Sequence, residues 1–221
     1  MSRIITFVYI LSTSLFGGAR VCAQDNAAKI AGALFQNACA QCHGAKGEGN
    51  VTFQAPPIAG LPAWYVRVQV ENFRAGRRGV HPQDIAGQMM RSISMVVDPV
   101  NIPGIAGLVA ALPRAASPPT PKMDMSIGAR LYADRCAECH RYNGTGELVF
   151  GAAPLAGLPD WYLMAQLRKF KNGQRGAASG DANGQKMILA ASYIEDEATL
   201  KSVVAYIMSL REIKAEQVFG N

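Results

Sequence analysis

The chain has 221 residues, which is enough for one large domain or two small ones. Charged residues make up 17% and apolar residues 49% of the sequence, so the composition is that of an ordinary globular protein and excludes a disordered or collagen-like chain. The net charge is +6, but no basic stretch interleaved with aromatic residues accompanies it. The charge therefore favours acidic protein surfaces over nucleic acid as partners.

The first 23 residues differ from the rest of the chain. A short basic region is followed by the apolar stretch Ile4–Phe16 and by small or modest residues up to position 23. This pattern predicts a cleaved secretory signal peptide over residues 1–23. The apolar stretch is shorter than the roughly 20 residues of a transmembrane helix. An uncleaved N-terminal anchor and lipid attachment at Cys22 are the alternatives.

Apolar residues recur at helical spacing in three stretches of each half of the chain, and no stretch shows convincing strand alternation. Pro62 and Pro159 stand where helices begin. Residues 44–60 and 141–157 are rich in Gly, Pro and Ala and predict loops. The sequence therefore predicts an all-α fold. In chain order the predicted helices are 30–38, 64–74, 103–112, 127–135, 161–171 and 196–210.

The first predicted helix of each half leads directly into a Cys-x-x-Cys-His motif. In this spacing the two sulfurs form thioether bonds to the haem vinyl groups, and the adjacent histidine lies under the iron as proximal ligand. Zinc or a redox dithiol is the alternative, but each motif offers three clustered ligands where zinc needs four. We therefore predict two covalently bound haem c groups, attached through Cys39, Cys42, Cys136 and Cys139 and ligated by His43 and His140.

The two motifs are 97 residues apart, and the same register holds around them. Residues 39–90 superpose on 136–187 without a gap, with 24 identities in 52 positions. A repeat of this length is a duplicated domain. The segment between the copies is rich in proline, which disfavours helix and strand and predicts an extended linker. The predicted organisation is a signal peptide at 1–23, domains at 24–112 and 123–221, and a linker at 113–122.

The repeat also identifies candidates for the second axial ligand of each iron. Met90 and Met187 each lie 47 residues after the motif histidine, inside a Gly-Gln-x-Met segment, and we predict that they ligate the two irons. Met89 is the main competitor in the first copy and His81 a further candidate, although neither has an equivalent in the second copy. Histidine–methionine ligation leaves no open position on the iron, which favours electron transfer over catalysis, and we predict no catalytic residue.

Other residues shared by the two copies are candidates for supporting roles. Pro57 and Pro154 each lie 14 residues after the histidine, and their carbonyls are candidate acceptors for the imidazole N–H, unless they only shape the loop. Arg78 and Arg175 stand in glycine-flanked loops, where a haem propionate, a partner's carboxylate or solvent are the candidate contacts. The aromatic pairs, which either contact haem or pack in the core, are Trp64, Tyr65, Trp161 and Tyr162.

The paired motifs, the proline that follows each of them, the Gly-Gln-x-Met segments and the terminal helices resemble class I cytochromes c, and the tandem arrangement is similar to the dihaem cytochrome c4 type. The likeness covers nearly all of the chain after the signal peptide. It implies an all-α periplasmic protein that carries single electrons, with two domains packed about a pseudo-twofold axis and their haem propionates close together. The partners it implies are a quinol-oxidising complex, a terminal oxidase or reductase, or a dehydrogenase.

The first copy departs from this pattern where its first and last helices should cross. Pro99 and Pro103 also interrupt its predicted last helix. We therefore expect the first domain to be looser than the second and its haem to have a different potential. The residues that form the crossing are Gly128, Tyr132 and Tyr206 in the second copy, against Ala31, Phe35 and Val109 in the first.

Three functions are compatible with these features. The leading hypothesis is a soluble electron carrier between respiratory partners, with no enzymatic activity of its own. The second is the cytochrome subunit of a periplasmic dehydrogenase. The third is a dihaem peroxidase or thiosulfate-oxidising enzyme, which needs a displaceable iron ligand and is disfavoured by the matched Met90 and Met187.

Overall fold

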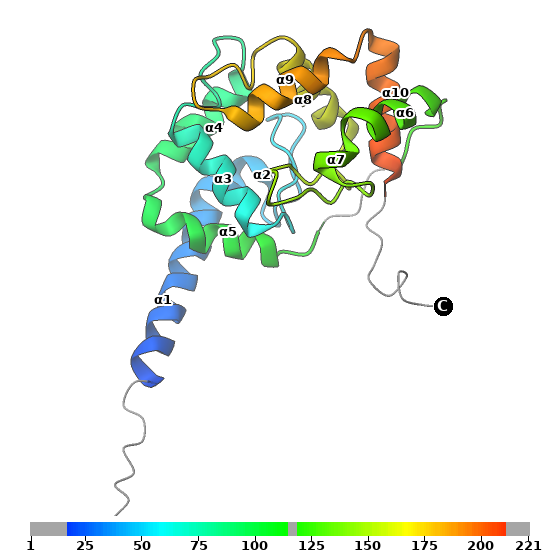
Figure 1. Cartoon of the computed structure of the whole chain (residues 1–221). Helices are drawn as coiled ribbons and strands as arrows, with labels where there is room; N and C mark the ends of the chain where they lie inside the picture. Colours follow the sequence, from blue (N-terminus) through cyan, green and yellow to red (C-terminus); the bar gives the residue numbers. More distant parts are fainter. Residues whose placement is uncertain (1–16, 115–118, 211–221) are drawn as a thin grey trace, which may run out of the picture.

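The structure is a computed structural model that describes residues 17–114 and 119–210. Residues 1–16 of the predicted signal peptide lie outside the described residues, and residues 17–23 form the beginning of α1 (Gly17–Leu34). The N-terminal part of α1 projects away from both domains (Figure 1). Cleavage after residue 23 and the limits of the two domains stay predictions.

The described residues form two helical domains and contain no β-strand, only the isolated bridges Asn50–Ala55 and Glu147–Ala152. This confirms the predicted all-α fold with two tandem domains. The first domain consists of α1, a π-helical turn at Phe35–Cys39, α2 (Ala40–His43), α3 (Ala63–Arg74), α4 (Ile85–Val96), a 3-10 turn at Pro99–Asn101 and α5 (Ile102–Ala111). The second consists of α6 (Ser126–Arg135), α7 (Ala137–His140), α8 (Asp160–Lys171), α9 (Ala182–Ser192) and α10 (Glu197–Ser209).

Helices α4 and α9 carry the candidate methionine ligands but are absent from the predicted helices. Each begins after an aspartate whose side chain caps it. Oδ1 of Asp84 accepts from the backbone N–H of Gly87 at 3.0 Å, and Oδ1 of Asp181 accepts from Gly184 at 2.9 Å. These caps satisfy N–H groups that the first helical turn leaves unpaired. In both copies an aspartate thus stands three residues before a glycine, and this spacing is the sequence signal that marks where each helix begins.

Each domain has its own hydrophobic core, which is what the duplication requires. In the first domain the buried cluster joins α1 and the π-helical turn to α5. In the second it joins α6 and α8 to α10. The two clusters share no residue, so each domain packs around its own first and last helices. The first cluster contains Ala31, Phe35, Val97, Ile102, Ile105 and Val109, and the second is centred on Tyr132, Leu163, Val203, Val204 and Ile207.

Among the described residues, no single helix is long and apolar enough to cross a membrane. The pair Ile85–Val96 and Pro99–Ala111 meets the length and composition criteria only when its two parts are taken together, across a bend of 99°.

The last helix of the first domain is not interrupted by its prolines, contrary to the prediction. Pro99 opens the separate 3-10 turn, and Pro103 lies in the first turn of α5. A proline is tolerated there because the N–H it lacks would have had no partner within the helix. The prolines therefore set where α5 begins, and they give no reason for a looser first domain.

The first and last helices of the second domain cross at a glycine. A Cβ atom on Gly128 would lie 2.1 Å from the backbone oxygen of Ser202, so no larger residue fits without moving α6 off α10. The hydroxyl of Ser202 accepts a hydrogen bond from the N–H of Gly128 at 2.9 Å. Beside this contact the rings of Tyr132 and Tyr206 pack with centroids 5.4 Å apart. The crossing thus combines close backbone approach with aromatic packing.

We predict that Gly128→Ala lowers the free energy of unfolding of the second domain by about 1–3 kcal/mol, the usual cost of overpacking a tight site. Denaturant unfolding of the haem-loaded protein, followed by helical circular dichroism, measures this. Gly107→Ala on α5 is the control, because a Cβ there has no neighbour within 4 Å. Equal effects of the two substitutions would contradict the tight crossing.

Candidate functional site

The histidine of each motif is buried, and one loop carbonyl orients its imidazole. Nδ1 of His43 lies 2.8 Å from the carbonyl oxygen of Pro56, and Nδ1 of His140 lies 2.8 Å from that of Ala153. A carbonyl oxygen can only accept a hydrogen bond, so Nδ1 donates its proton in both rings. The other nitrogen, Nε2, keeps its lone pair, which is what binding to iron requires.

The prediction that Pro57 and Pro154 supply these carbonyls is wrong by one residue. The acceptors belong to the residues directly before them. A proline restricts the residue that precedes it to extended backbone conformations, because its ring would otherwise clash with that residue. Pro57 and Pro154 thus favour the backbone conformation that turns the preceding carbonyl toward the imidazole. Their role is to orient the acceptor, not to be it.

Burial also keeps both imidazoles neutral. It lowers the pKa of His43 and His140, and the hydrogen bond to the carbonyl offsets this only in part. A neutral ring is the form that binds a metal. Below the ordinary histidine pKa of about 6.5, protons bind the unfolded chain more readily than these buried rings, so acid destabilises the fold.

Each predicted methionine lies near the histidine of its own domain. In the second domain Sδ of Met187 lies 3.5 Å from Nε2 of His140. In the first domain Met90 lines the same cavity as His43 and the two motif cysteines, and this cavity has a volume of about 410 Å³. In each domain the first cysteine of the motif directly precedes a short helix, α2 or α7, which carries the second cysteine and the histidine, while α4 or α9 carries the methionine.

Met89 lines the first cavity as well, but its side chain is 46% exposed. Met89 precedes Met90 by one residue on the same helix, so the two side chains point in different directions. His81 is not among the residues that line the cavity; its Nδ1 accepts a hydrogen bond from the backbone N–H of Gln83 at 3.2 Å. The position shared with Met187 is that of Met90.

The four cysteines of the motifs are half-buried. Burial raises the pKa of Cys39 and of Cys136 to about 11. A reactive dithiol or a zinc thiolate needs the opposite shift, toward lower pKa. Within the parts of the chain that the structure describes, no three or more His, Cys, Asp or Glu side chains are placed to hold a metal ion. The environment of the thiols favours haem attachment over the zinc and dithiol alternatives.

The cavity of the first domain suits a flat, largely apolar ring with an anionic edge. Val66, Val70 and Phe73 are among the apolar side chains that form most of its lining. At its polar edge lies Arg78, whose Nε is buried without a hydrogen-bond partner. A buried N–H without an acceptor is costly, and a carboxylate such as a haem propionate would satisfy it. The residues present therefore fit haem.

Part of this lining comes from the other domain. Tyr162, Gln166 and Lys169, all on α8, complete the wall of the cavity that holds His43. In Figure 1, α8 and α9 lie against the part of the first domain formed by α3 and α4. The site of the first domain is thus built at the boundary between the two domains and depends on their docking.

Two arginines and two glutamines cross-link the domains at this boundary. Oε1 of Gln69 accepts from Arg78 at 2.8 Å and from Arg175 at 3.2 Å. Oε1 of Gln166 accepts from Arg175 at 2.7 Å and from Arg78 at 3.1 Å. The four residues are two pairs of repeat equivalents, so this crossed pattern is that of a pseudo-twofold axis. The arginines are therefore interdomain residues, a role that the sequence did not indicate.

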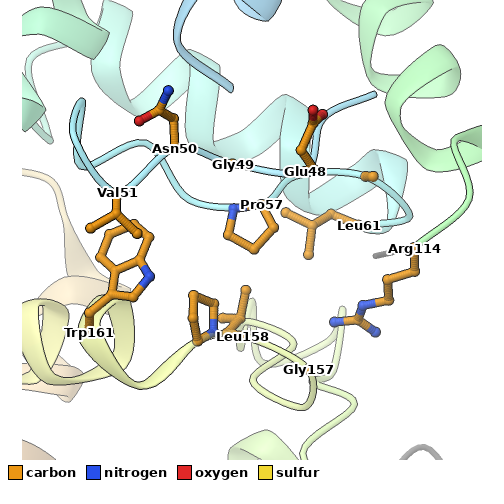
Figure 2. Close-up of a pocket in the computed structure, with 12 residues that line it drawn as sticks. Glu48, Gly49, Asn50, Val51, Pro57, Leu61, Arg114, Gly157, Leu158 and Trp161 are labelled. Carbon is orange, nitrogen blue, oxygen red and sulfur yellow. The ribbon is translucent and has the colours of Figure 1, made fainter. Parts of the chain in front are cut away.

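The aromatic pairs that the two copies share divide between the cavity of the first domain and the boundary between the domains. Burial raises the pKa of Tyr65, which lines the first cavity, while the hydroxyl of Tyr162 accepts from Arg78 at 3.3 Å. Trp161 belongs to a second, smaller hollow of about 220 Å³ between the domains. Figure 2 shows Val51 of the first domain facing its indole, and Pro57 facing Leu158. Arg114 of the linker also lines this hollow and donates to the carbonyl of Ala156.

The fold and the two sites define an all-α protein with two covalent haem sites. The sequence model of the cytochrome c family matches residues 28–102 and 125–211. The chain therefore belongs to the cytochrome c family, with two haem c groups, and its tandem arrangement is that of a dihaem cytochrome c4. It is a dihaem electron-transfer cytochrome.

Similar proteins include carriers and an enzyme. The thiosulfate dehydrogenase electron acceptor of Stutzerimonas stutzeri (strain A1501) is 28% identical over 189 residues, covering 81% of this chain and 82% of that protein. Cytochrome c4 from Acidithiobacillus ferrooxidans superposes with a TM-score of 0.63 at 26% identity, over 78% of this chain and 98% of its own. Thiosulfate dehydrogenase (TsdBA) from Marichromatium purpuratum superposes with a TM-score of 0.63 at 28% identity, over 83% of this chain. The present chain spans only 40% of that enzyme's length.

We predict that Gln166→Leu weakens docking of the two domains, because it removes an acceptor shared by both buried arginines. The expected loss is about 1–3 kcal/mol, the cost of leaving buried donors unsatisfied. Calorimetry of the haem-loaded protein should show two separated unfolding transitions in place of closely coupled ones. Gln174→Leu removes an exposed interdomain bond to Gln83 and is the matched control. An unchanged calorimetric profile for Gln166→Leu would contradict the structural role of the crossed cluster.

Proposed function

We propose that this chain is a periplasmic carrier of single electrons between respiratory partners. Each haem is attached through the two cysteines of its motif, and its iron lies between the motif histidine and a methionine. The attachment residues are Cys39, Cys42, Cys136 and Cys139, and the axial ligands are His43 and Met90 in the first domain and His140 and Met187 in the second.

The observation that carries the proposal is the pairing of Nε2 of His140 with Sδ of Met187 at 3.5 Å. The lone pair of Nε2 and the thioether sulfur thus face each other, as two ligands of one iron would. The iron supplies reversible one-electron chemistry, and the thioether favours its ferrous form and so raises the potential. With a histidine and a methionine as its two axial ligands, the iron would have no open position for a substrate. This arrangement supports electron transfer and not a reaction on bound peroxide.

We predict that Met90→His and Met187→His each lower the midpoint potential of one haem while the other keeps its own. The expected drop is on the order of 0.1–0.3 V, within the roughly 0.8 V range that axial ligands span. Redox titration with optical detection of the methionine–iron band measures it. Each variant should lose half of the band.

Met89→Leu is the control for the first domain. Because Met89 is not the proposed ligand, this substitution should leave both the potential of the first haem and the methionine–iron band unchanged. Loss of the band in Met89→Leu, with Met90→His unaffected, would assign the ligand to Met89. Rapid cyanide binding by the unmodified reduced protein would contradict a carrier with both axial positions occupied.

A thiosulfate-oxidising dehydrogenase is the donor that the similar proteins favour. Both a thiosulfate dehydrogenase electron acceptor and a thiosulfate dehydrogenase are among them. In this second candidate function the chain accepts electrons from such an enzyme but does not oxidise thiosulfate itself. Its mildly basic charge suits an acidic docking surface on that partner.

We predict that thiosulfate alone leaves both haems oxidised, while thiosulfate with a catalytic amount of thiosulfate dehydrogenase reduces both. Visible absorbance of the purified protein follows the reduction. The rate should fall as ionic strength rises, because surface charges steer the encounter. Reduction by thiosulfate without the dehydrogenase would instead make the chain an enzyme.

We predict that the mature protein begins at Gln24 and is recovered from the periplasm. Intact-mass analysis of the periplasmic fraction tests both points, since the mass must equal that of residues 24–221 plus two haems. Recovery of the full-length chain with the membranes would favour the uncleaved anchor. A lipid-sized mass increase on a chain beginning at Cys22 would favour the lipoprotein alternative.

A further inference from the structure

One ion pair joins the second domain to the site of the first. Nζ of Lys169, on α8, lies 2.5 Å from Oδ1 of Asp84, the residue that caps α4. The Asp84 side chain is 2% exposed and that of Lys169 is 16% exposed. Two charges removed from water in this way interact strongly, and each becomes costly if its partner is removed.

The pair sits next to the candidate ligand of the first haem. Oδ1 of Asp84 accepts from Lys169 and, at 3.0 Å, from the backbone N–H of Gly87, so one oxygen both caps α4 and receives the interdomain cation. Met90 follows one turn later on the same helix, and Lys169 itself lines the cavity. The charge of Lys169 therefore lies at the wall of the haem site and is tied to the helix that carries the ligand.

The second domain has no equivalent of this pair. The repeat places Asn72 at the position of Lys169, and Asp181 at the position of Asp84. Asp181 caps α9 in the same way, but it is only half-buried, and no ion pair to it occurs among the described residues. Arg78 is also close enough to Asp84 to interact with it, but its equivalent Arg175 is present in the other copy. Lys169 is thus a cavity-lining charge of the first site that the repeat does not supply at the equivalent position of the second.

We propose that Lys169 of the second domain is a positioning residue for the haem of the first, and that its charge sets that haem's potential apart from its neighbour's. The proposal rests on the proposed function, in which Met90 ligates the first iron. Lys169 neutralises the buried carboxylate of Asp84 and ties α4 to α8, so docking of the domains and the potential of the first haem are linked.

The sign of the effect follows from charge alone. Reduction lowers the charge of the iron by one, so a nearby cation favours the ferrous form and a nearby anion the ferric form. Lys169→Met removes the cation that is bonded to the Asp84 carboxylate and lowers the potential of the first haem. Asp84→Asn keeps a side chain that caps helices well but removes the negative charge, and it raises that potential. The double variant has neither charge, so the potential of its first haem should lie close to that of the unmodified protein.

The experiment is a spectroelectrochemical titration of the full-length, haem-loaded protein and these three variants, each also carrying Met187→His. That background moves the second haem to lower potential, so the remaining high-potential step belongs to the first. Each single variant should change the reduction equilibrium constant of this step by on the order of tenfold, or about 59 mV for one electron, in opposite directions. The double variant should cancel the two shifts.

Asn72→Met is the matched control, since it introduces the same side chain at the equivalent position of the other copy without removing a charge, and it should leave the first haem's potential unchanged. Shifts of equal sign in Lys169→Met and Asp84→Asn, with loss of the methionine–iron band, would overturn the electrostatic role in favour of a merely structural one. Unchanged potentials in both variants would overturn the proposal entirely. Neither result touches the ligand assignment, which fails only if Met90→His leaves the first haem's potential as it was.

Discussion

Each domain is organised around one hydrogen bond, from Nδ1 of the motif histidine to a loop carbonyl. The bond is 2.8 Å long in both copies and leaves Nε2 with its lone pair, which in the second domain faces the sulfur of Met187. The rest of the domain serves this geometry. The short helices α2 and α7, with the cysteine directly before each of them, hold the motif cysteines beside the imidazole. The loop that follows supplies the acceptor carbonyl, and α4 or α9 supplies the methionine. Burial of the imidazole keeps it neutral and ready to bind iron.

Much of this arrangement can be predicted from the sequence, because covalent chemistry and the repeat restrict it. The Cys-x-x-Cys-His spacing dictates the attachment, and the shared register of Met90 and Met187 selects the methionines. The sequence prediction places the acceptor carbonyl one residue too late, because side-chain identities do not show in which direction a backbone carbonyl points. Helices α4 and α9 are absent from the prediction. Residues of α4 line the cavity of the first domain, and the Asp84 and Asp181 caps mark where the two helices begin.

The interdomain contacts are beyond prediction for a different reason. The repeat shows which residues are equivalent, but not which copy each one touches. Arg78 and Arg175 look alike in the sequence, yet each donates to a glutamine of the opposite copy as well as to one of its own. A pseudo-twofold axis pairs every residue near it with its own equivalent across the boundary. Near such an axis, one position at which the two copies differ, such as Lys169 and its equivalent Asn72, is enough to make the two haem sites unequal.

The two helix crossings show how duplicated domains reach one architecture by different packing. In the second domain the glycine lies on the first helix, where Gly128 meets the backbone at Ser202. In the first domain Ala31 occupies that position, and the glycine is instead on the last helix, where a Cβ on Gly104 would lie 3.4 Å from the Cβ of Ala31. Close approach needs one small residue at the contact, on either helix, and the buried Phe35 fills the space that Tyr132 fills in the other copy. The glycine missing from α1 is therefore compensated by a glycine on α5, so the crossing gives no reason for the first domain to be looser.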